Sequence, residues 1–497
     1  MPESPSAYQE AFRPQFHFSP PKAWMNDPNG MVYHQGIYHL FYQYYPDDII
    51  WGPMHWGHAV SKDLLHWKHR PIALEPDEKG YIFSGCAVVD VNNTSSLGSK
   101  ENPPLVSIFT YHDEQRKQAE EKSFQSQALA FSLDQGKSWS KFEGNPVLLD
   151  ENLIDFRDPK VFWHIEIEKW IMIIACGDHV RIYHSPNLIE WEYISSFGQG
   201  QGCHEGVWEC PDLFELSLGE SGRSKWVMLV SLVKGGPNGG SVTQYFIGEF
   251  DGFSFKNEGV EQEIKWLDFG TDNYAGVTWY NAPTEKGEKV FIGWMSNWDY
   301  AASTPTENWR GAMTLPRTLF LLDLDEGIYL GMKPFSSILN LRDKEIQLER
   351  TIKKNSVIEW IASIGHSPLL ALLVKAWDKD FLKLELKFTS EGGKCLYVQL
   401  DPIKGELLLD RGKLENEGLG DKFTPLLKAP LLKGSQKEGL HIFLDTSSIE
   451  IFSCGGAINI SAQIFPKENF YKIEVRGEGS GFEEVDISLF ELKSIWK

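Results

Sequence analysis

Ser61-Lys62-Asp63-Leu64-Leu65-His66-Trp67 is the stretch that decides the fold, because variants of it recur along the first part of the chain. The other copies are residues 132–139 (SLDQGKSW), 185–191 (SPNLIEW) and, in degenerate form, 251–255 (DGFSF). Each copy follows a strand-like run, and its polar turn delivers an aromatic residue to the next strand. The aromatic residues are 52 to 72 positions apart, somewhat above the period of about 40–50 residues that is typical of propeller blades. The repeat predicts a propeller of about five blades, and ordinary hairpin punctuation is the alternative that it leaves open.

The rest of the sequence is typical of an all-β protein. Short runs rich in Val, Ile, Tyr, Phe and Trp alternate with Gly, Pro, Asn and Asp, and long amphipathic helical periodicity is nearly absent. Residues 1–332 form the predicted propeller. At residues 333–350 a Pro start and helix-like spacing indicate a linker with a short helix, and residues 351–497 suit a β-sandwich.

The charge of the chain excludes some classes of partner. It has 497 residues, with 48 Lys and Arg against 69 Asp and Glu, and a formal net charge of −21. Nearly all of that excess lies before position 333, as do fifteen of the eighteen Trp. Negative charge repels phosphate backbones and anionic lipid heads, so we expect neither nucleic acid nor a membrane as a partner. The sequence does not determine the oligomeric state.

Cysteine and histidine spacing points to no metal or cofactor. The six Cys are scattered without CxxC pairs, and the sequence from His204 to Trp208 lacks the second His of a zinc-protease motif. No apolar run is long enough to span a bilayer, and residues 1–5 lack the features of a signal peptide. We therefore expect a cytoplasmic protein if Met1 is the native start, and a secreted one if a signal peptide has been removed.

Three acidic residues lie in unusual local sequences and could carry chemistry. They occur in Asn26-Asp27-Pro28-Asn29-Gly30, Phe156-Arg157-Asp158-Pro159 and Trp208-Glu209-Cys210-Pro211. The acids are 131 and 51 residues apart, so they belong to different blades, whose innermost strands converge on the propeller axis. Paired carboxylates in an aromatic cleft are what glycosidic bond cleavage requires. Taken alone, Asp-Pro-Asn-Gly is also simply a good turn.

The neighbours of the acids predict their protonation. We expect the Arg157 guanidinium to keep Asp158 ionised. Glu209, placed between Trp208 and Cys210, should have the drier surroundings and be the better proton donor. Cys210 has no His pattern to pair with, so we expect it to pack against Glu209 and not to act as a nucleophile.

These motifs resemble glycoside hydrolase family 32, the β-fructofuranosidases, which include invertases, exo-inulinases and exo-levanases. The resemblance covers nearly the whole chain, and further motifs that carry it are residues 41–43 (FYQ), 51–58 (WGPMHWGH), 83–85 (FSG), 293–298 (GWMSNW) and 444–452 (LDTSSIEIF). It implies a five-bladed β-propeller followed by a C-terminal β-sandwich. The closest likeness is to bacterial exo-levanases and exo-inulinases.

The resemblance also implies roles for single residues. Asp27 would be the nucleophile, Asp158 the transition-state stabiliser and Glu209 the general acid/base of a retaining reaction, with the Asp27 and Glu209 carboxyls about 5–5.5 Å apart. The implied substrate-binding residues are Asn26, Gln43, Trp51, Phe83, Ser84, Arg157, Tyr274 and Trp294. Trp24 and Trp208 become further candidates for a sugar-binding wall. Asn273 precedes Tyr274 where many members have an aromatic residue.

The sequence thus predicts an exo-acting β-fructosidase without metal or cofactor. Its substrates would be sucrose and the fructans levan and inulin. Two alternatives remain: a transfructosylase that uses the same residues, and a non-catalytic fructan-binding propeller. Hydrolysis preference among sucrose, levan and inulin is not predicted.

Overall fold

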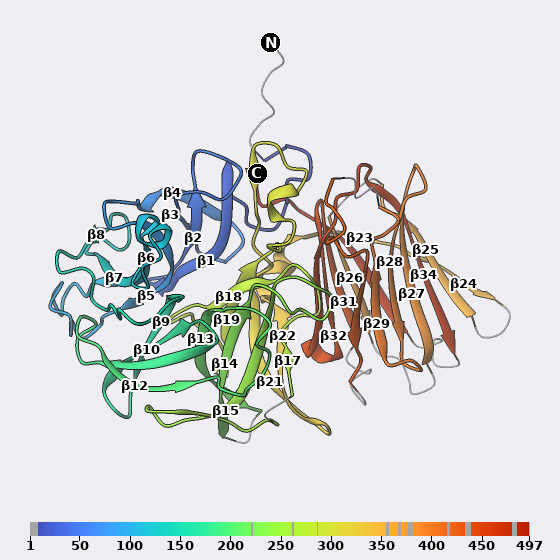
Figure 1. Ribbon diagram of the computed structural model, residues 1–497. Helices are drawn as coiled ribbons and strands as arrows, with labels where there is room; N and C mark the ends of the chain where they lie inside the picture. Colours follow the sequence, from blue (N-terminus) through green and yellow to red (C-terminus); the bar gives the residue numbers. More distant parts are fainter. Residues whose placement is uncertain are drawn as a thin grey trace, which may run out of the picture.

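The computed structural model describes residues 8–219, 222–260, 263–285, 287–353, 357–365, 369–375, 381–414, 418–432, 439–479 and 485–496. Within these residues the chain is almost entirely β-structure, in an N-terminal group of sheets and a C-terminal pair that lie side by side (Figure 1). The first residues, on which the expectation about a signal peptide rests, lie outside the described part.

The described residues before position 335 form five sheets, which is the number of blades that the repeat spacing predicts. In chain order, the strands of the first two sheets are β1 (Ala23–His34), β2 (Ile37–Tyr45), β3 (His55–Ser61), β4 (Trp67–Leu74), β5 (Tyr81–Val89), β6 (Leu105–His112), β7 (Gln125–Ser132) and β8 (Ser140–Lys141). The next two contain β9 (Phe156–His164), β10 (Lys169–Cys176), β11 (His179–Ser185), β12 (Glu192–Phe197), β13 (Trp208–Leu218), β14 (Arg223–Leu232), β15 (Val242–Phe250), β16 (Phe255–Asn257) and β17 (Lys265–Trp266).

The fifth sheet closes the ring. Its strands are β18 (Tyr274–Thr278), β19 (Lys289–Trp294), β21 (Arg317–Leu324) and β22 (Gly327–Pro334). The short strand β20 (Trp309–Arg310) lies between β19 and β21 in the chain, but it pairs in parallel with β1 in the first sheet. The first and last sheets are therefore joined by backbone hydrogen bonds. Short helices are α1 (Glu114–Gln118) and the 3-10 turn η1 (Ala301–Ser303).

The sequence repeat is the turn between the third and fourth strands of a sheet. Between β3 and β4 the Ser61 hydroxyl accepts the backbone N–H of Leu64 at 2.9 Å, while Asp63 accepts the N–H of His66 at 2.9 Å. Between β11 and β12 the Ser185 hydroxyl accepts the N–H of Asn187 at 3.1 Å, and Asn187 Oδ1 accepts the N–H of Glu190 at 2.9 Å. Such side-chain caps satisfy the backbone donors of a tight turn. The repeat therefore marks the same turn in successive sheets of the propeller. It is more than the ordinary hairpin punctuation that was the alternative.

The C-terminal part is a sandwich of two antiparallel sheets. One has the order β23-β35-β26-β31-β32-β33 and the other β24-β25-β34-β27-β28-β29-β30. Their strands are β23 (Arg342–Ile346), β24 (Glu349–Lys353), β25 (Val357–Ser363), β26 (Leu370–Lys375), β27 (Phe381–Ser390), β28 (Cys395–Asp401), β29 (Glu406–Asp410), β30 (Leu426–Pro430), β31 (Leu440–Asp445), β32 (Ser448–Ser453), β33 (Ile458–Gln463), β34 (Phe470–Gly479) and β35 (Asp486–Leu492). A further 3-10 turn, η4 (Cys454–Gly456), joins β32 and β33.

The prediction of an all-β propeller followed by a sandwich is confirmed. Between the two parts the chain forms a 3-10 helix, η2 (Ser336–Leu341). The sequence pattern predicts a linker with a short helix at residues 333–350, but β23 and β24 already pair into the sandwich sheets there. These strands are polar and partly exposed, so composition does not separate them from a linker.

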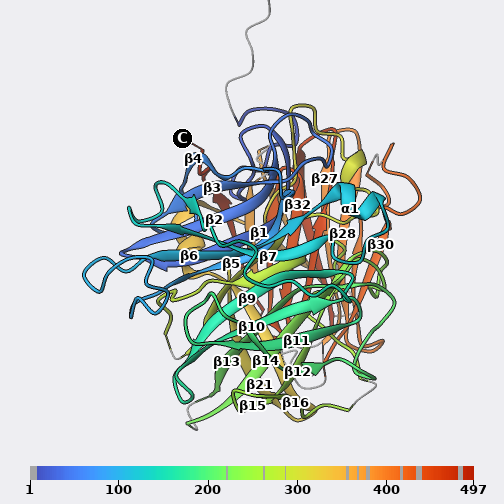
Figure 2. The same cartoon turned by 60° about the vertical axis from the view of Figure 1, so that its left-hand side comes forward.

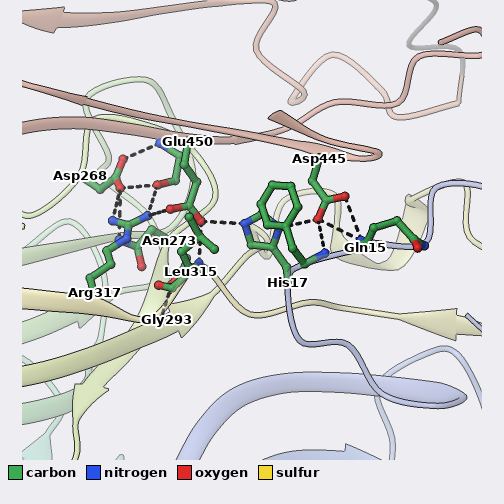
Figure 3. A network of polar contacts seen from close by, with 12 residues as sticks. Gln15, His17, Asp268, Asn273, Gly293, Leu315, Arg317, Asp445 and Glu450 are labelled. Atoms are coloured by element: carbon green, nitrogen blue, oxygen red, sulfur yellow. Dashed lines mark hydrogen bonds and ion pairs between the residues drawn. The ribbon is translucent and has the colours of Figure 1, made fainter. Parts of the chain in front are cut away.

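Buried polar contacts connect the two parts (Figure 3). The His17 ring lies between two carboxylates of the sandwich, with Nδ1 2.7 Å from Asp445 and Nε2 3.1 Å from Glu450. Arg317 of β21 donates to Glu450 at 2.9 Å and to Asp268 at 3.1 Å. All five side chains are almost fully buried. The sandwich is therefore held to the propeller by an ionic network as well as by apolar packing.

Candidate active site

The five innermost strands of the propeller meet at one end of its axis. They are β1, β5, β9, β13 and β18, which are the first strands of the five sheets. Each one places one polar side chain of the site there: Asp27, Ser84, Asp158, Glu209 and Tyr274. The three acids, far apart in the sequence, are brought together in this way.

Each inner strand has a β-bulge at its site residue. In each bulge, two residues lie opposite a single residue of the neighbouring strand. These pairs are residues 26–27 in β1, 83–84 in β5, 158–159 in β9, 210–211 in β13 and 275–276 in β18. A bulge breaks the alternation of side chains and turns one of them out of the regular pattern. Asp158 and Cys210 also have left-handed backbone, with φ of 64° and 46°. The bulges thus aim the acids along the axis.

Asp27 is held by three donors. Its Oδ1 accepts a hydrogen bond from Asn26 Nδ2 at 3.0 Å, and its Oδ2 accepts one from Ser84 Oγ at 2.7 Å. The Cys210 thiol is 3.6 Å from the same Oδ2. Trp24 Nε1 donates to Asn26 Oδ1 at 2.8 Å and so fixes the Asn26 amide. Burial, with the nearby charge of Glu209, raises the pKa of Asp27 to about 6, although the three donors act against this rise.

Asp158 differs from its expected state. Its Oδ2 accepts the backbone N–H of Cys210 at 3.0 Å and lies 3.6 Å from the Cys210 thiol. Burial raises the pKa of Asp158; Arg157 lowers it, but the charges of Glu209 and Asp27 add to the rise. Arg157 thus acts on Asp158 in the expected direction, but it does not offset the effect of burial. The guanidinium turns to other carboxylates instead.

Those carboxylates are Glu209 and Asp155. Arg157 donates to Glu209 Oε1 from Nη2 at 2.8 Å and from Nε at 3.2 Å, and its Nη1 contacts Asp155. The Tyr274 hydroxyl donates to Glu209 Oε2. Glu209 thus has a polar neighbourhood, and the expectation of dry surroundings is wrong. Successive side chains of a strand point to opposite faces, so Trp208 packs into the core behind Glu209.

Cys210 also differs from its expected packing. It contacts Asp27 and Asp158, not Glu209 as expected. Burial raises the pKa of the Cys210 thiol well above its usual value. The group is therefore a protonated S–H donor to both aspartates.

The acids open into a pocket of about 270 Å³. Its lining includes the predicted residues Asn26, Asp27, Gln43, Trp51, Phe83, Ser84, Arg157, Asp158 and Glu209. The residues that the sequence analysis did not single out are His112, Lys117, Phe124, Gln125, Asp155 and Trp298. Trp298 ends the motif of residues 293–298, and that motif could have indicated it. Lys117 and Phe124 lie on and after α1, and no motif indicates them.

Two predicted substrate-binding residues, Tyr274 and Trp294, do not line the pocket. The Tyr274 hydroxyl donates a hydrogen bond to Glu209, and the Trp294 ring is fully buried against Trp24 and Trp298. Of the four Trp expected to form a sugar-binding wall, only Trp51 is exposed, at 38%. The other three belong to the core, because large aromatic rings contribute most where they are fully desolvated.

Within the described residues, no cluster of three or more His, Cys, Asp or Glu side chains has an arrangement that could hold a metal ion. No helix of the described part is long and apolar enough to cross a membrane.

A propeller with three carboxylates converging in one pocket, and a sandwich packed against it, has the architecture of a glycoside hydrolase. The N-terminal domain model of the glycosyl hydrolases family 32 matches residues 17–334, and the C-terminal model of that family matches residues 365–493. The chain therefore belongs to glycosyl hydrolases family 32, as the resemblance predicts.

Similar proteins are known in bacteria and fungi. The chain is 42% identical over 494 residues to the levanase of Bacillus subtilis strain 168, and the alignment covers 99% of this chain and 72% of the levanase. The crystal structure of an exo-inulinase from Aspergillus awamori superimposes with a TM-score of 0.89 at 34% identity, covering 98% of this chain and all of that one. A β-fructofuranosidase of Schwanniomyces occidentalis, solved with fructosyl-erythritol, gives 0.85 at 30% identity over 98% and 99% of the two chains.

Proposed function

We propose that the protein is a retaining exo-β-fructosidase that releases terminal fructose from sucrose and from levan- or inulin-type chains. The observation that carries the proposal is the grouping of Asp27, Asp158 and Glu209 at the base of one small pocket. A pocket of about 270 Å³ is small, and this suits a terminal sugar unit. The levanase, exo-inulinase and fructofuranosidase similarities support the same substrates.

In the first step the Asp27 carboxylate attacks the anomeric carbon of the terminal fructose. The bond from that carbon to the leaving oxygen breaks, and Glu209 gives this oxygen its proton. The products are a fructosyl ester of Asp27 and the shortened chain. Ser84 and Asn26 position the attacking carboxylate.

In the second step Glu209, now a carboxylate, takes a proton from water, and the water oxygen replaces Asp27 on the anomeric carbon. Arg157 and Tyr274 donate to Glu209 in its carboxylate form. Asp155 gives the Arg157 guanidinium a second partner while Glu209 holds a proton. Asp158 contacts hydroxyls of the fructose ring, and this contact strengthens as the ring flattens.

Incubation with sucrose, inulin and levan in parallel tests the proposal. We expect free fructose from all three, and no release from Asp27→Asn or Glu209→Gln, since loss of the nucleophile or of the acid costs several orders of magnitude. Glu215→Gln is a matched control, because Glu215 is exposed on the same strand as Glu209. Near-normal hydrolysis by either site variant contradicts the mechanism. Oligosaccharides exceeding free fructose at high sucrose would identify a transfructosylase, and fructan binding without any product would identify a binding propeller.

A further inference from the structure

A second hollow lies between the third and fourth sheets, and the catalytic reaction does not use it. It has a volume of about 930 Å³, and its lining includes residues of β11, β12 and β16. Figure 2 labels these three strands. The loop of residues 198–206 connects the two sheets and forms part of the wall. We call this hollow the blade 3–4 groove.

Glycine creates the depth of the groove. Gly198 and Gly202 have φ of 135° and 68°, which L-residues rarely adopt. A Cβ on Gly198 would lie 2.8 Å from the Trp208 ring, and one on Gly202 would lie 2.4 Å from Gln244. The loop therefore lies directly on the core. Below it, Phe197 and Phe255 pack edge to face at 5.0 Å and are almost fully buried.

The lining of the groove is polar but nearly uncharged. Its side chains include one carboxylate, Asp178, and one amine, Lys256, although the surrounding propeller carries nearly all the negative charge of the chain. The other polar groups are two imidazoles, of which His179 lies 3.1 Å from Asp178, and amides and hydroxyls; they are His179, His204, Gln199, Gln201, Asn257 and Ser196. Such groups donate and accept hydrogen bonds without requiring a charged partner. They suit an uncharged, hydroxyl-rich ligand and not an anion or a cation.

Two features give the groove a defined shape. Asn257 Nδ2 donates to Gln201 Oε1 at 2.8 Å, so the amides of the two walls are fixed relative to each other. The His204 ring stacks on Trp208 at 5.1 Å and is itself exposed. One face of the imidazole is therefore supported by the core while the residue borders the groove. An exposed, supported ring of this kind can pack against the C–H face of a sugar.

The groove adjoins the catalytic pocket through a shared wall. The Gly177 carbonyl accepts the N–H of Trp208 at 2.6 Å, and the Gly177 N–H donates to the Asp155 carbonyl at 3.3 Å. Asp155 lines the catalytic pocket, whereas Asp178, the next residue after Gly177, lines the groove. A long substrate whose end occupies the pocket could therefore reach the groove over this wall.

We propose that the blade 3–4 groove binds fructan chain away from the end that is cleaved. The proposal rests on the proposed function, since it assigns a further part of the same substrate to a second site. Sucrose has a single sugar unit beyond its terminal fructose, whereas levan and inulin continue, so we expect the groove to act on polymers.

Ser196→Trp tests the proposal, because Ser196 is exposed on β12 and its replacement places an indole in the groove. We expect KM for levan and inulin to rise about tenfold, equivalent to about 1.4 kcal/mol, with unchanged kcat and KM for sucrose. The double variant Gln199→Ala with His204→Ala removes contacts without adding bulk and should act in the same direction. Ser140→Trp, on the outermost strand of the second sheet, is the matched control.

Unchanged polymer KM in both groove variants would overturn the proposal, and so would an equal change for sucrose and polymers. Direct binding separates this failure from failure of the proposed function. Glu209→Gln protein should bind levan or inulin on affinity electrophoresis, and Ser196→Trp in that background should weaken the binding about tenfold. If wild-type protein releases no fructose from sucrose, the proposed function fails, and the binding measurement still decides whether the groove holds fructan.

Discussion

Replacement of His17 by Gln should remove a stabilising contribution that depends on pH. Both ring nitrogens of His17 face carboxylates, with Asp445 at Nδ1 and Glu450 at Nε2 (Figure 3). A carboxylate only accepts, so both nitrogens must donate and the ring must be an imidazolium. Burial disfavours this charge, but hydrogen bonds and charge interactions with Asp445 and Glu450 outweigh it and raise the pKa of His17 to about 9.

The magnitude follows from linkage between protonation and folding. Each pKa unit corresponds to about 1.4 kcal/mol, so a rise from 6.5 to about 9 corresponds to about 3 kcal/mol. The folded-state pKa is the higher one, so the contribution is fully present below the unfolded-state pKa of 6.5 and is lost as pH rises through about 9. The window for the experiment is therefore pH 6 to pH 9.5.

The assay is urea unfolding of wild type and His17→Gln, followed by tryptophan fluorescence across this window. The difference in unfolding free energy should shrink by about 3 kcal/mol between pH 6 and pH 9.5. His441→Gln is the matched control: burial lowers the pKa of His441 to about 4, so its ring is neutral throughout the window. A difference that stays constant with pH, or a His17 resonance that titrates near pH 6.5 in NMR, would refute the reasoning.

Three predictions concern the reaction. Burial raises the pKa of Asp27 to about 6, so kcat/KM should fall as pH drops through about 6, and Ser84→Ala should move this acidic limb to higher pH because it removes a donor to the carboxylate. Tyr274→Phe removes the hydroxyl that donates to Glu209 and should lower kcat/KM on sucrose; an unchanged kcat/KM would contradict this. Arg157→Gln should lower kcat/KM on sucrose about 10²-fold, measured as initial rates of fructose release. A circular dichroism spectrum equal to that of the wild type shows that the variant is folded.

The repeat predicted much of the fold because it is a structural unit. Ser at its first position and Asp or Asn at its third cap the turn in three sheets, and Asp251 alone caps the corresponding turn in a fourth, so a sequence pattern locates a strand junction. The fifth sheet has no copy, because β21 and β22 are joined by the two-residue hairpin of Asp325 and Glu326. That sheet could be inferred only from chain length.

The convergence of the three acids was predictable, but their neighbours were not. Asp27, Asp158 and Glu209 lie in distinctive local sequences, and converging strands bring them together. Adjacency in sequence misled the assignment of Arg157, because next-neighbour side chains in a strand point apart and the guanidinium reaches across to the next blade. The Lys117 and Phe124 part of the rim depends on the path of the loop around α1, which local patterns do not determine.

The bulges explain why the acids are each followed closely by proline. Pro159 and Pro211 lie within the two-residue bulges of β9 and β13, and Pro28 directly follows the one in β1. Proline has no N–H to give to a ladder, and a bulge is the position within a strand where the ladder is already interrupted. The proline that makes these segments look like turns is therefore compatible with an inner strand. Asp-Pro-Asn-Gly therefore has the local features of a turn and also lies in an inner strand, because the interrupted ladder turns the Asp27 carboxylate into the pocket.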